Sequence, residues 1–225
     1  MKFIHFRQTH KKLLFYSLFA VLLASFILLS GFVLLKSPEY LDLHISKEIQ
    51  EKHSENLNTL MIGISWFGRT PISIVMVILT SLFFLSFRLK KEALFIAATL
   101  LSGILGLLFK IVINRPRPSK DLVILLEETK YQSFPSGHVL FYTVFFGSLI
   151  IIILHLKNIK FSLKIFLAAV CFSMIFLGAV SRVYLGAHWF TDVLGGFILG
   201  IICLLIMGYF YLKNNREASE DILLK

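Results

Sequence analysis

The chain has 225 residues, of which 57% are hydrophobic and 16% are charged, and its mean hydropathy is +0.81. Soluble domains carry about 25% charged residues, so this balance excludes a water-soluble globule, and it also excludes a disordered chain. Cys171 and Cys203 lie inside apolar runs, which excludes a disulfide framework. The net charge of +10 comes from Lys and Arg scattered between apolar stretches, which favours lipid headgroups over nucleic acid as the partner. A polytopic membrane protein remains.

Six uncharged apolar windows predict six transmembrane helices in an all-α fold, because runs of this length lack the two-residue alternation of barrel strands. The windows cover residues 13–35, 70–87, 93–109, 139–156, 165–181 and 193–212. The first window follows basic residues, as in a signal peptide, but no small-residue cleavage site ends it, so we interpret it as a retained anchor. We expect one membrane-embedded domain over residues 1–225, with the anchor and an amphipathic outer loop in 1–69 and the motif-bearing core in 93–212.

The distribution of basic residues predicts the orientation of these spans. Thirteen of the 23 Lys and Arg residues fall on the side that holds both termini. By the positive-inside rule, both termini are expected in the cytoplasm, and the loops 36–69, 114–138 and 182–188 are expected on the extracytoplasmic side. A bacterial inner membrane fits this arrangement.

Two of the expected outer loops contain apolar segments. Leu41, Ile45 and Ile49 repeat every four residues among charged residues, which predicts a short amphipathic helix at the membrane surface. Residues 122–126 form an apolar patch in a polar segment and are also a candidate for the headgroup layer. Ordinary loops remain an equal alternative for both segments.

The third span ends in a rigid pair of cations. Lys110 still lies on the expected helix, and Pro116 and Pro118 force an extended exit that holds Arg117 at a fixed separation from it. On this motif alone, an interfacial anchor that reaches toward headgroups is the favoured alternative.

The fourth span begins with an expected anion site. Ser136 suits the start of a helix, Gly137 lets a backbone N–H approach a ligand, and the free N–H groups of a helix N-terminus attract negative charge. His138 stands beside them. An ordinary N-cap followed by an interfacial histidine is an equal alternative here.

The fifth and sixth spans flank a third motif. Arg182 ends the fifth span, and His188 and Asp192 stand four residues apart, so on a helix they share a face. The carboxylate can then accept a hydrogen bond from one imidazole nitrogen and leave the other free to attack an electrophile. The alternative is a structural His–Asp pair that caps a helix.

Together these motifs supply cations, helix N–H groups and two histidines, which is what phosphoryl transfer requires. The equatorial oxygens of the phosphate need a cationic cradle, the nucleophile must lie in line, and an acid must protonate the leaving oxygen. We see no metal-binding cluster in the sequence.

The motif spacing resembles that of the type 2 phosphatidic acid phosphatase superfamily of integral membrane lipid phosphatases, related to vanadium haloperoxidases and bacterial acid phosphatases. Six residues separate Lys110 from Arg117, five separate Arg182 from His188, and three separate His188 from Asp192. The resemblance implies that His188 forms a phosphohistidine, that Asp192 orients it, and that His138 is the general acid and later the base. The phosphate cradle that it implies consists of Lys110, Arg117, Ser136, Gly137 and Arg182. Arg115 and Tyr131 fall outside the pattern and receive no role.

The resemblance also implies activity without a cofactor or divalent metal. An outward-facing site gives undecaprenyl pyrophosphate a narrow lead over phosphatidylglycerol phosphate, phosphatidic acid and lipid A phosphates. A vanadate-dependent haloperoxidase and a non-catalytic membrane scaffold or transporter are the alternative functions. We expect the lipid to enter from the bilayer past the segments 41–49 and 122–126, and the sequence does not indicate an oligomeric state. Residues Gly196 and Gly200 either mediate dimerisation or allow close helix packing within one subunit.

Overall fold

The structure is a computed structural model that describes residues 2–36, 39–129, 131–157 and 159–223. Within those ranges the regular secondary structure is entirely helical, which confirms the predicted all-α class. The helices are α1 (Lys2–Lys36), α2 (Glu39–Gln50), α3 (Glu55–Trp66), α4 (Thr70–Ser86), α5 (Lys90–Ala97), α6 (Leu100–Ile113), α7 (Gly137–His155), α8 (Phe161–Tyr184) and α9 (Phe190–Leu223).

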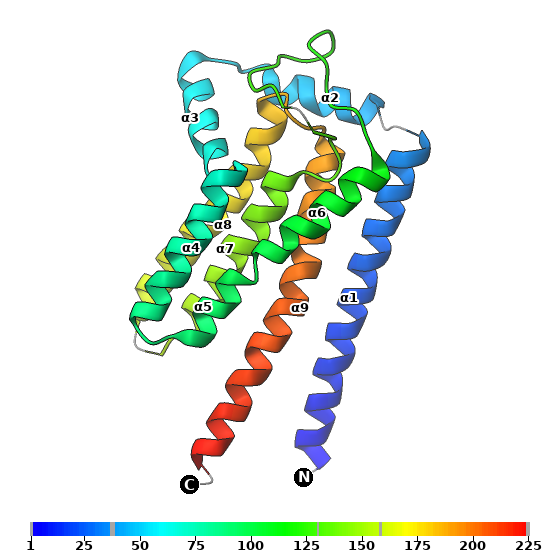
Figure 1. The fold of residues 1–225 in the computed structure, drawn as a ribbon. Helices are drawn as coiled ribbons and strands as arrows, with labels where there is room; N and C mark the ends of the chain where they lie inside the picture. The colour runs from blue at the N-terminus through cyan, green and yellow to red at the C-terminus, as the bar shows by residue number, and fades with distance from the viewer. Residues whose placement is uncertain (1, 37–38, 130, 158, 224–225) are drawn as a thin grey trace.

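The spans agree in number with the sequence-based prediction. Five segments are long and apolar enough to cross a membrane, with α5 and α6 together forming one of them, and the bent pair α3 and α4 makes a sixth. The free ends of α1 and α9 lie at the same end of the bundle, and the long loop between α6 and α7 lies at the opposite end (Figure 1). The structure therefore confirms that both termini lie on the same side of the bundle. Their location in the cytoplasm stays a prediction.

Helix α3 was not expected, because residues 55–66 were assigned to an outer loop. Its N-terminus is capped by Ser54, whose hydroxyl accepts a hydrogen bond from the backbone N–H of Leu57 at 3.3 Å. The pair α3 and α4 is bent by 57° at the junction that contains Gly68. A Cβ atom on Gly68 would overlap the ring of His138, so only glycine lets this junction pack closely against α7.

The third span is also less regular than the uninterrupted window 93–109 predicted. It is broken between α5 and α6, where the Thr99 hydroxyl donates to the carbonyl of Ile96 at 2.6 Å and the Ser102 hydroxyl donates to that of Thr99 at 2.7 Å. Hydroxyl groups that bond to the backbone of the preceding turn are a common cause of helix distortion. The break lets α6 lean across the bundle toward the end with the long loop (Figure 1).

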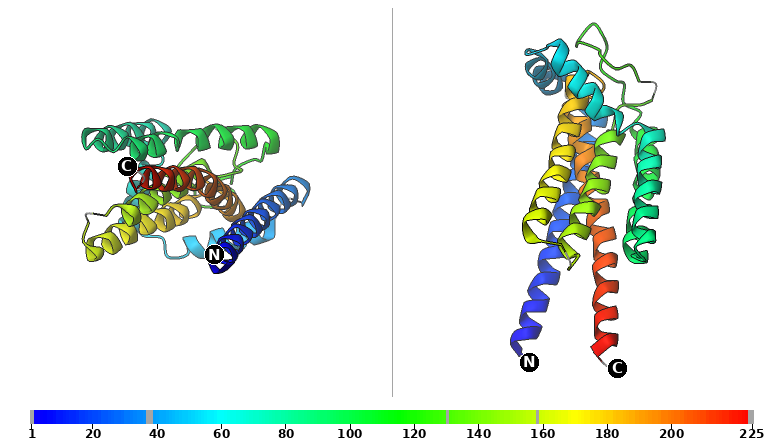
Figure 2. Two further views of the ribbon diagram at one scale, coloured as in Figure 1. Left: turned by 90° about the horizontal axis from the view of Figure 1, so that it is seen from below. Right: turned by 90° about the vertical axis from the view of Figure 1, so that its left-hand side faces the viewer.

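Helices α7 and α9 occupy the middle of the bundle, with α4, α5 and α6 along one side and α1 and α8 on the other (Figure 2). Glycines in α9 permit its close contact with α7. A Cβ on Gly196 would lie 2.6 Å from the carbonyl oxygen of Ser136, and one on Gly200 would lie 2.7 Å from Thr143. The glycine pair therefore packs within one subunit, as the second of the two sequence-based alternatives proposed.

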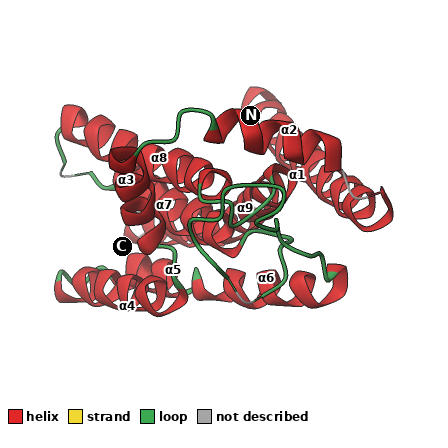
Figure 3. Ribbon diagram, turned by 90° about the horizontal axis from the view of Figure 1, so that it is seen from above, coloured by secondary structure: helices red, strands yellow, loops and turns green. Residues whose placement is uncertain are grey.

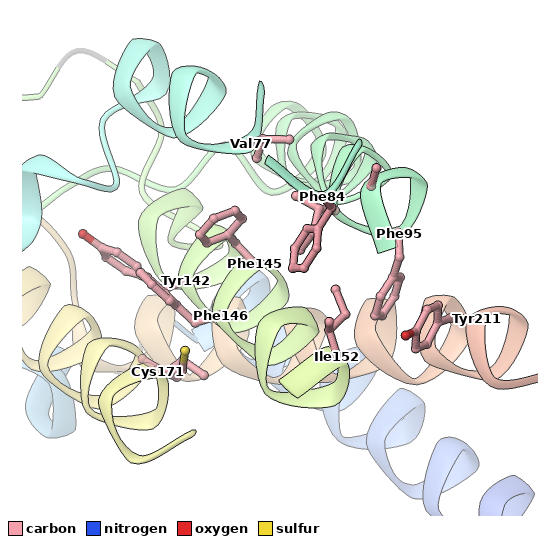
Figure 4. Close-up of a cluster of buried hydrophobic side chains, with 12 residues drawn as sticks. Val77, Phe84, Phe95, Tyr142, Phe145, Phe146, Ile152, Cys171 and Tyr211 are labelled. Atoms are coloured by element: carbon pink, nitrogen blue, oxygen red, sulfur yellow. The ribbon is translucent and has the colours of Figure 1, made fainter. Parts of the chain in front are cut away.

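One of the buried apolar clusters packs α4, α5, α7, α8 and α9 together (Figure 4). In it, the rings of Phe95 and Tyr211 stack with centroids 4.6 Å apart and fix α5 against α9. Around them, α7 contributes Tyr142, Phe145 and Ile152, all of which are buried. This cluster joins the helices on both sides of α7.

Helix α2 lies across the end of the bundle opposite the termini (Figure 1). The predicted helix at 41–49 is confirmed, and the structure adds which of its faces packs on the protein. The side chains of Asp42, Ser46 and Gln50 are buried, whereas Leu41 is 44% exposed, because the polar face packs on the protein. Residues 122–126 form a loop, in which both backbone groups of Ile124 bond to the Gln50 side chain at 2.8 and 3.0 Å. The position of either segment relative to lipid stays a prediction.

Candidate active site

The three sequence motifs converge at the end of the bundle that α2 covers, beneath the loop between α6 and α7 (Figure 3). Lys110 is in the last turn of α6, and Arg117 is in the loop that follows. His138 is in the first turn of α7, Arg182 is near the end of α8, and Asp192 is in the first turn of α9. Residues from four helices and two loops therefore share one polar region.

The loop after α6 is extended, as its prolines predicted. Asn114 adopts a left-handed conformation with φ of 45°, which ends α6 and redirects the chain. The Arg117 guanidinium then reaches the turn between α8 and α9, where Nη1 donates to the carbonyl of Ala187 at 2.5 Å and lies 3.1 Å from His188 Nε2. Its Nε also donates to the carbonyl of Tyr131. Arg117 thus joins the first motif to the third.

His188 is 2% exposed, and its neighbours define its tautomer. An arginine can only donate, so Nε2 must accept the hydrogen bond from Arg117 and must carry a lone pair. The proton then lies on Nδ1, which is 3.4 Å from the Ser133 hydroxyl. Burial, together with the positive charges of Arg117 and Lys110, lowers the pKa of His188 well below its usual value. His188 is therefore a neutral base at pH 7, with an unprotonated Nε2.

The predicted hydrogen bond between His188 and Asp192 is replaced by an indirect link. The two residues do not share a helical face, because His188 precedes the start of α9, and Nδ1 is 3.6 Å from Asp192 Oδ2. That oxygen accepts instead from the Ser133 hydroxyl and from the backbone N–H of Trp189, the latter at 2.9 Å. Ser133 thus stands between the imidazole and the carboxylate, since it can accept from one and donate to the other.

Several buried polar atoms in this region have no hydrogen-bond partner within the described part of the chain. They are Ser136 Oγ, His138 Nε2, Arg182 Nε and Arg182 Nη2. Ser136 precedes α7 as its N-cap residue, yet its hydroxyl makes no capping bond. A buried polar group without a partner costs about 1–3 kcal/mol, so these atoms need a ligand to bond. Two donors from arginine, a hydroxyl and a histidine suit the oxygens of a phosphate.

Lys110 completes the positive charge of the site. Its Nζ donates to the carbonyl of Gln132 at 2.6 Å and lies 3.3 Å from that of Ser133, which holds the ammonium beside the start of α7. The free N–H groups of the first turn of α7 add partial positive charge. Burial and the nearby Arg182 lower the pKa of Arg117 to about 10, so Arg117 remains charged at pH 7. The arrangement is therefore suited to an anion next to the unprotonated nitrogen of His188.

A protein-family model described as the PAP2 superfamily matches residues 91–216, which include all three motifs. The chain belongs to the PAP2 superfamily. This result confirms the family expected from the motif spacing and makes the protein a membrane-embedded phosphatase of the lipid-phosphatase type.

Two curated relatives cover most of the chain. Phosphatidylglycerophosphatase B of Bacillus subtilis (strain 168) is 28% identical over 202 residues, which is 87% of this chain and 95% of the relative. An undecaprenyl-diphosphatase of Sulfolobus acidocaldarius is 29% identical over 188 residues, which is 80% of this chain and 84% of the relative.

Two solved PAP2-type structures are also similar. A transmembrane phosphatidylglycerolphosphate phosphatase from Bacillus subtilis aligns with a TM-score of 0.76 at 26% identity, covering 87% of this chain and 96% of that chain. LpxE from Aquifex aeolicus aligns with a TM-score of 0.60 at 28% identity, covering 74% and 94%. The six-span bundle is therefore a PAP2 membrane fold.

Around the PAP2 motifs, the structure adds polar residues that sequence reasoning missed. Arg115 Nη1 donates to Asp192 Oδ1 at 2.6 Å, and its Nη2 donates to Asp42 Oδ2 at 2.6 Å. Ser133 links His188 to Asp192, as described above. The proximity of Arg115 to the first motif was the available signal, whereas Asp42 looked like part of the solvent face of an amphipathic helix.

A second polar contact lies on the other side of the site. Glu127 Oε2 accepts from Arg182 Nη1 at 2.7 Å and from the Ser65 hydroxyl at 2.9 Å. Burial alone would raise the pKa of Glu127, but the charge of Arg182 and the hydrogen bonds hold it below the usual value. Glu127 therefore fixes one edge of the Arg182 guanidinium and leaves its Nε and Nη2 for a ligand.

The ligand set is cationic and hydrogen-bond donating. Within the described ranges, no group of three or more His, Cys, Asp or Glu side chains is arranged to hold a metal ion. Lys110, Arg117 and Arg182 contribute positive charge to this region.

Proposed function

We propose that this protein hydrolyses a phosphomonoester or a pyrophosphate of a membrane lipid through a phosphohistidine on His188, without a metal ion. The observation that carries the proposal is the pairing of an unprotonated His188 Nε2 with a buried set of unpartnered donors. A nucleophile and an anion-binding cradle at one place are the two requirements of phosphoryl transfer.

The proposed reaction has two steps. Nε2 of His188 attacks the phosphorus atom, the bond from phosphorus to the leaving oxygen breaks, and His138 gives that oxygen a proton. The His188 imidazole then carries a positive charge, which the path from Nδ1 through Ser133 to Asp192 stabilises. In the second step His138 takes a proton from water, which attacks phosphorus and releases inorganic phosphate and free His188.

For the substrate, we propose undecaprenyl pyrophosphate, with phosphatidylglycerol phosphate as the second candidate. The predicted extracytoplasmic orientation favours a carrier lipid of the outer leaflet, and one relative is named as an undecaprenyl-diphosphatase. The second candidate is favoured by the relative of that name and by the structural match with a TM-score of 0.76.

The first experiment measures phosphate release by the purified protein in detergent with excess EDTA. The panel contains undecaprenyl pyrophosphate, phosphatidylglycerol phosphate and phosphatidic acid. We expect release from at least one lipid, complete loss with His188→Ala, and inhibition by vanadate, which mimics five-coordinate phosphorus. Activity that disappears in EDTA and returns with Mg²⁺ would contradict a reaction without metal.

The second experiment uses the leaving group to distinguish the roles of the histidines. The leaving group of a pyrophosphate or of an activated aryl phosphate departs without a full proton transfer. The alkoxide that leaves an alkyl phosphate needs a proton. We expect His138→Ala to lower kcat roughly 10²–10⁴-fold with phosphatidylglycerol phosphate, and much less with an aryl phosphate. Labelled phosphohistidine in acid-quenched His188→Ala protein would disprove the assignment of the nucleophile.

A further inference from the structure

Helix α2 supplies a buried carboxylate to the catalytic region. Asp42 is fully buried, although α2 lies outside the segment that matches the PAP2 family model. Its two oxygens accept three hydrogen bonds, from Arg115 Nη2 at 2.6 Å, from the Thr191 backbone N–H at 2.9 Å, and from the Thr191 hydroxyl at 2.8 Å, with Oδ2 taking both side-chain donors. Three donors in all hold this carboxylate in one position.

The first of these contacts connects Asp42 to the catalytic aspartate through one guanidinium. Arg115 is 5% exposed, and it donates through Nη2 to Asp42 and through Nη1 to Asp192 Oδ1, each at 2.6 Å. Buried ion pairs of this kind have rigid geometry, because breaking one partner leaves an uncompensated charge. The position of Asp192 is therefore coupled to the position of α2.

The second contact caps the helix that carries Asp192. The backbone N–H of Thr191 is in the first turn of α9, where N–H groups have no partner within the helix. Asp42 accepts that N–H from a different helix, and its negative charge opposes the positive end of the α9 dipole. A residue 149 positions away in the sequence thus performs the function of an N-cap.

We propose that Asp42 is a positioning residue for the phosphatase reaction: through Arg115 and the start of α9, it holds Asp192 where that carboxylate can orient His188 by way of Ser133. The inference rests on the proposed function. Asp42 does not reach the phosphate cradle, so its removal changes the charge stabilisation of the reacting His188 and leaves phosphate binding by Lys110, Arg117 and Arg182 in place.

The test compares Asp42→Asn with wild type in the full-length protein in detergent. Outer-shell partners of functional residues typically contribute 10–100-fold to activity. We expect Asp42→Asn to lower kcat by roughly that factor, counted per vanadate-binding site, while KM and the vanadate Kd change less than about threefold. Counting sites removes any loss that is due only to unfolded protein.

The matched control is Glu48→Gln, which removes the same charge from the exposed face of the same helix. The Glu48 side chain is 63% exposed, and its carboxylate lies 3.5 Å from the exposed His44 on the same helix. We expect its kcat to equal that of wild type. A similar loss of kcat in both variants would mean that the net charge of α2 controls activity and that the contact made by Asp42 does not. That result would overturn the proposal.

A double-mutant cycle tests whether Asp42 acts through Arg115. We expect Arg115→Met to lower kcat at least as much as Asp42→Asn, and the double variant to lose less than the product of the two single losses, because both changes break the Arg115 link while Asp42→Asn also weakens the cap on α9. Fully additive losses of kcat would overturn the inference, and so would an unchanged kcat per site in Asp42→Asn. In either case, phosphate release by the wild-type protein would still support the proposed function. A wild-type protein that releases phosphate from no lipid would contradict the proposed function and this inference with it.

Discussion

His188 lies among cationic side chains and still offers a lone pair, because Arg117 donates to its Nε2. We expect a bound phosphate to replace His188 as a partner of this guanidinium, because Nε2 must lose that contact before it can attack phosphorus.

The pH dependence of activity follows from this environment. Burial and the charges of Arg117 and Lys110 lower the pKa of His188 well below 6.5, so the folded protein binds fewer protons there than the unfolded chain. The contribution of His188 to stability is complete above pH 6.5 and is lost as pH falls below that value. We expect the acid limb of kcat/KM below pH 6.5, measured with a lipid whose phosphate titration is known in the same micelles.

Removing a positive charge beside His188 should shift the acid limb of kcat/KM to higher pH. Arg117→Gln removes a positive charge next to the imidazole, so the pKa of His188 rises and the acid limb moves to higher pH. An acid limb at or above pH 6.5 in wild type, or a downward movement in Arg117→Gln, would contradict the neutral-histidine assignment.

Arg182 tests the cradle at the level of single atoms. Its buried Nε and Nη2 have no partner in the described structure, and a lysine cannot supply two donors in a fork. We expect Arg182→Lys to weaken vanadate binding roughly tenfold to hundredfold, which corresponds to one charged hydrogen bond of about 1.5–3 kcal/mol. Isothermal titration measures the Kd, and Arg88→Lys, at the exposed turn between α4 and α5, is the control that should bind as wild type does.

Sequence reasoning found the residues whose chemistry and spacing form a motif, and it missed those defined by long-range contacts. Lys110, His138 and His188 could be predicted because each lies at the mouth of a span. Asp42 could not, since an acidic residue on an amphipathic helix ordinarily faces water and its partner Arg115 is 73 positions away. Only the folded chain brings the two together.

At the level of helices, α7 and α9 approach closely because α9 presents glycines to α7. Gly196→Ala would place a Cβ 2.6 Å from the backbone oxygen of Ser136, which cannot move without disturbing the start of α7. We expect a loss of about 1–3 kcal/mol in unfolding free energy, as for other overpacked sites. A lower melting temperature in detergent, together with a lower kcat, would report the displacement of Ser136.

Gly103→Ala is the matched control for that prediction. Gly103 is also a helical glycine, in α6, but a Cβ there would meet no atom within 4 Å. Alanine has the higher helix propensity by about 0.8–1.0 kcal/mol, so we expect an unchanged or slightly raised melting temperature. Equal destabilisation by both substitutions would show that the α7–α9 contact is looser than the structure has it.

Among the helices, hydropathy predicted the spans well and their irregularities poorly. The windows over α7, α8 and α9 correspond to single helices, because length and apolar composition alone define them. Helix α3 and the break before α6 depend on individual hydrogen bonds, those of Ser54 and Thr99, which carry no hydropathy signal.

For the whole molecule, the untested expectation is the side of the membrane on which the site lies. Ser119 is exposed in the loop over the site, and Lys157 is in the turn between α7 and α8 at the opposite end. We expect Ser119→Cys to react with a membrane-impermeant thiol reagent in intact cells and Lys157→Cys to react only after lysis. The native Cys171 and Cys203 are buried and should stay unlabelled. The reverse pattern would place the site in the cytoplasm.

The contact between Asp42 and Thr191 also has a consequence for biogenesis. During synthesis the ribosome releases α2 and the loop with Arg115 while the start of α9 is still untranslated, because 149 positions separate the two contacting residues. A nascent chain with five inserted spans therefore has neither its nucleophile nor the helix that Asp42 caps. If His188 is the nucleophile, we expect hydrolytic capacity to arise only when the final span enters the bilayer and the start of α9 meets α2, and we expect prematurely terminated chains to be inert toward the lipids around them.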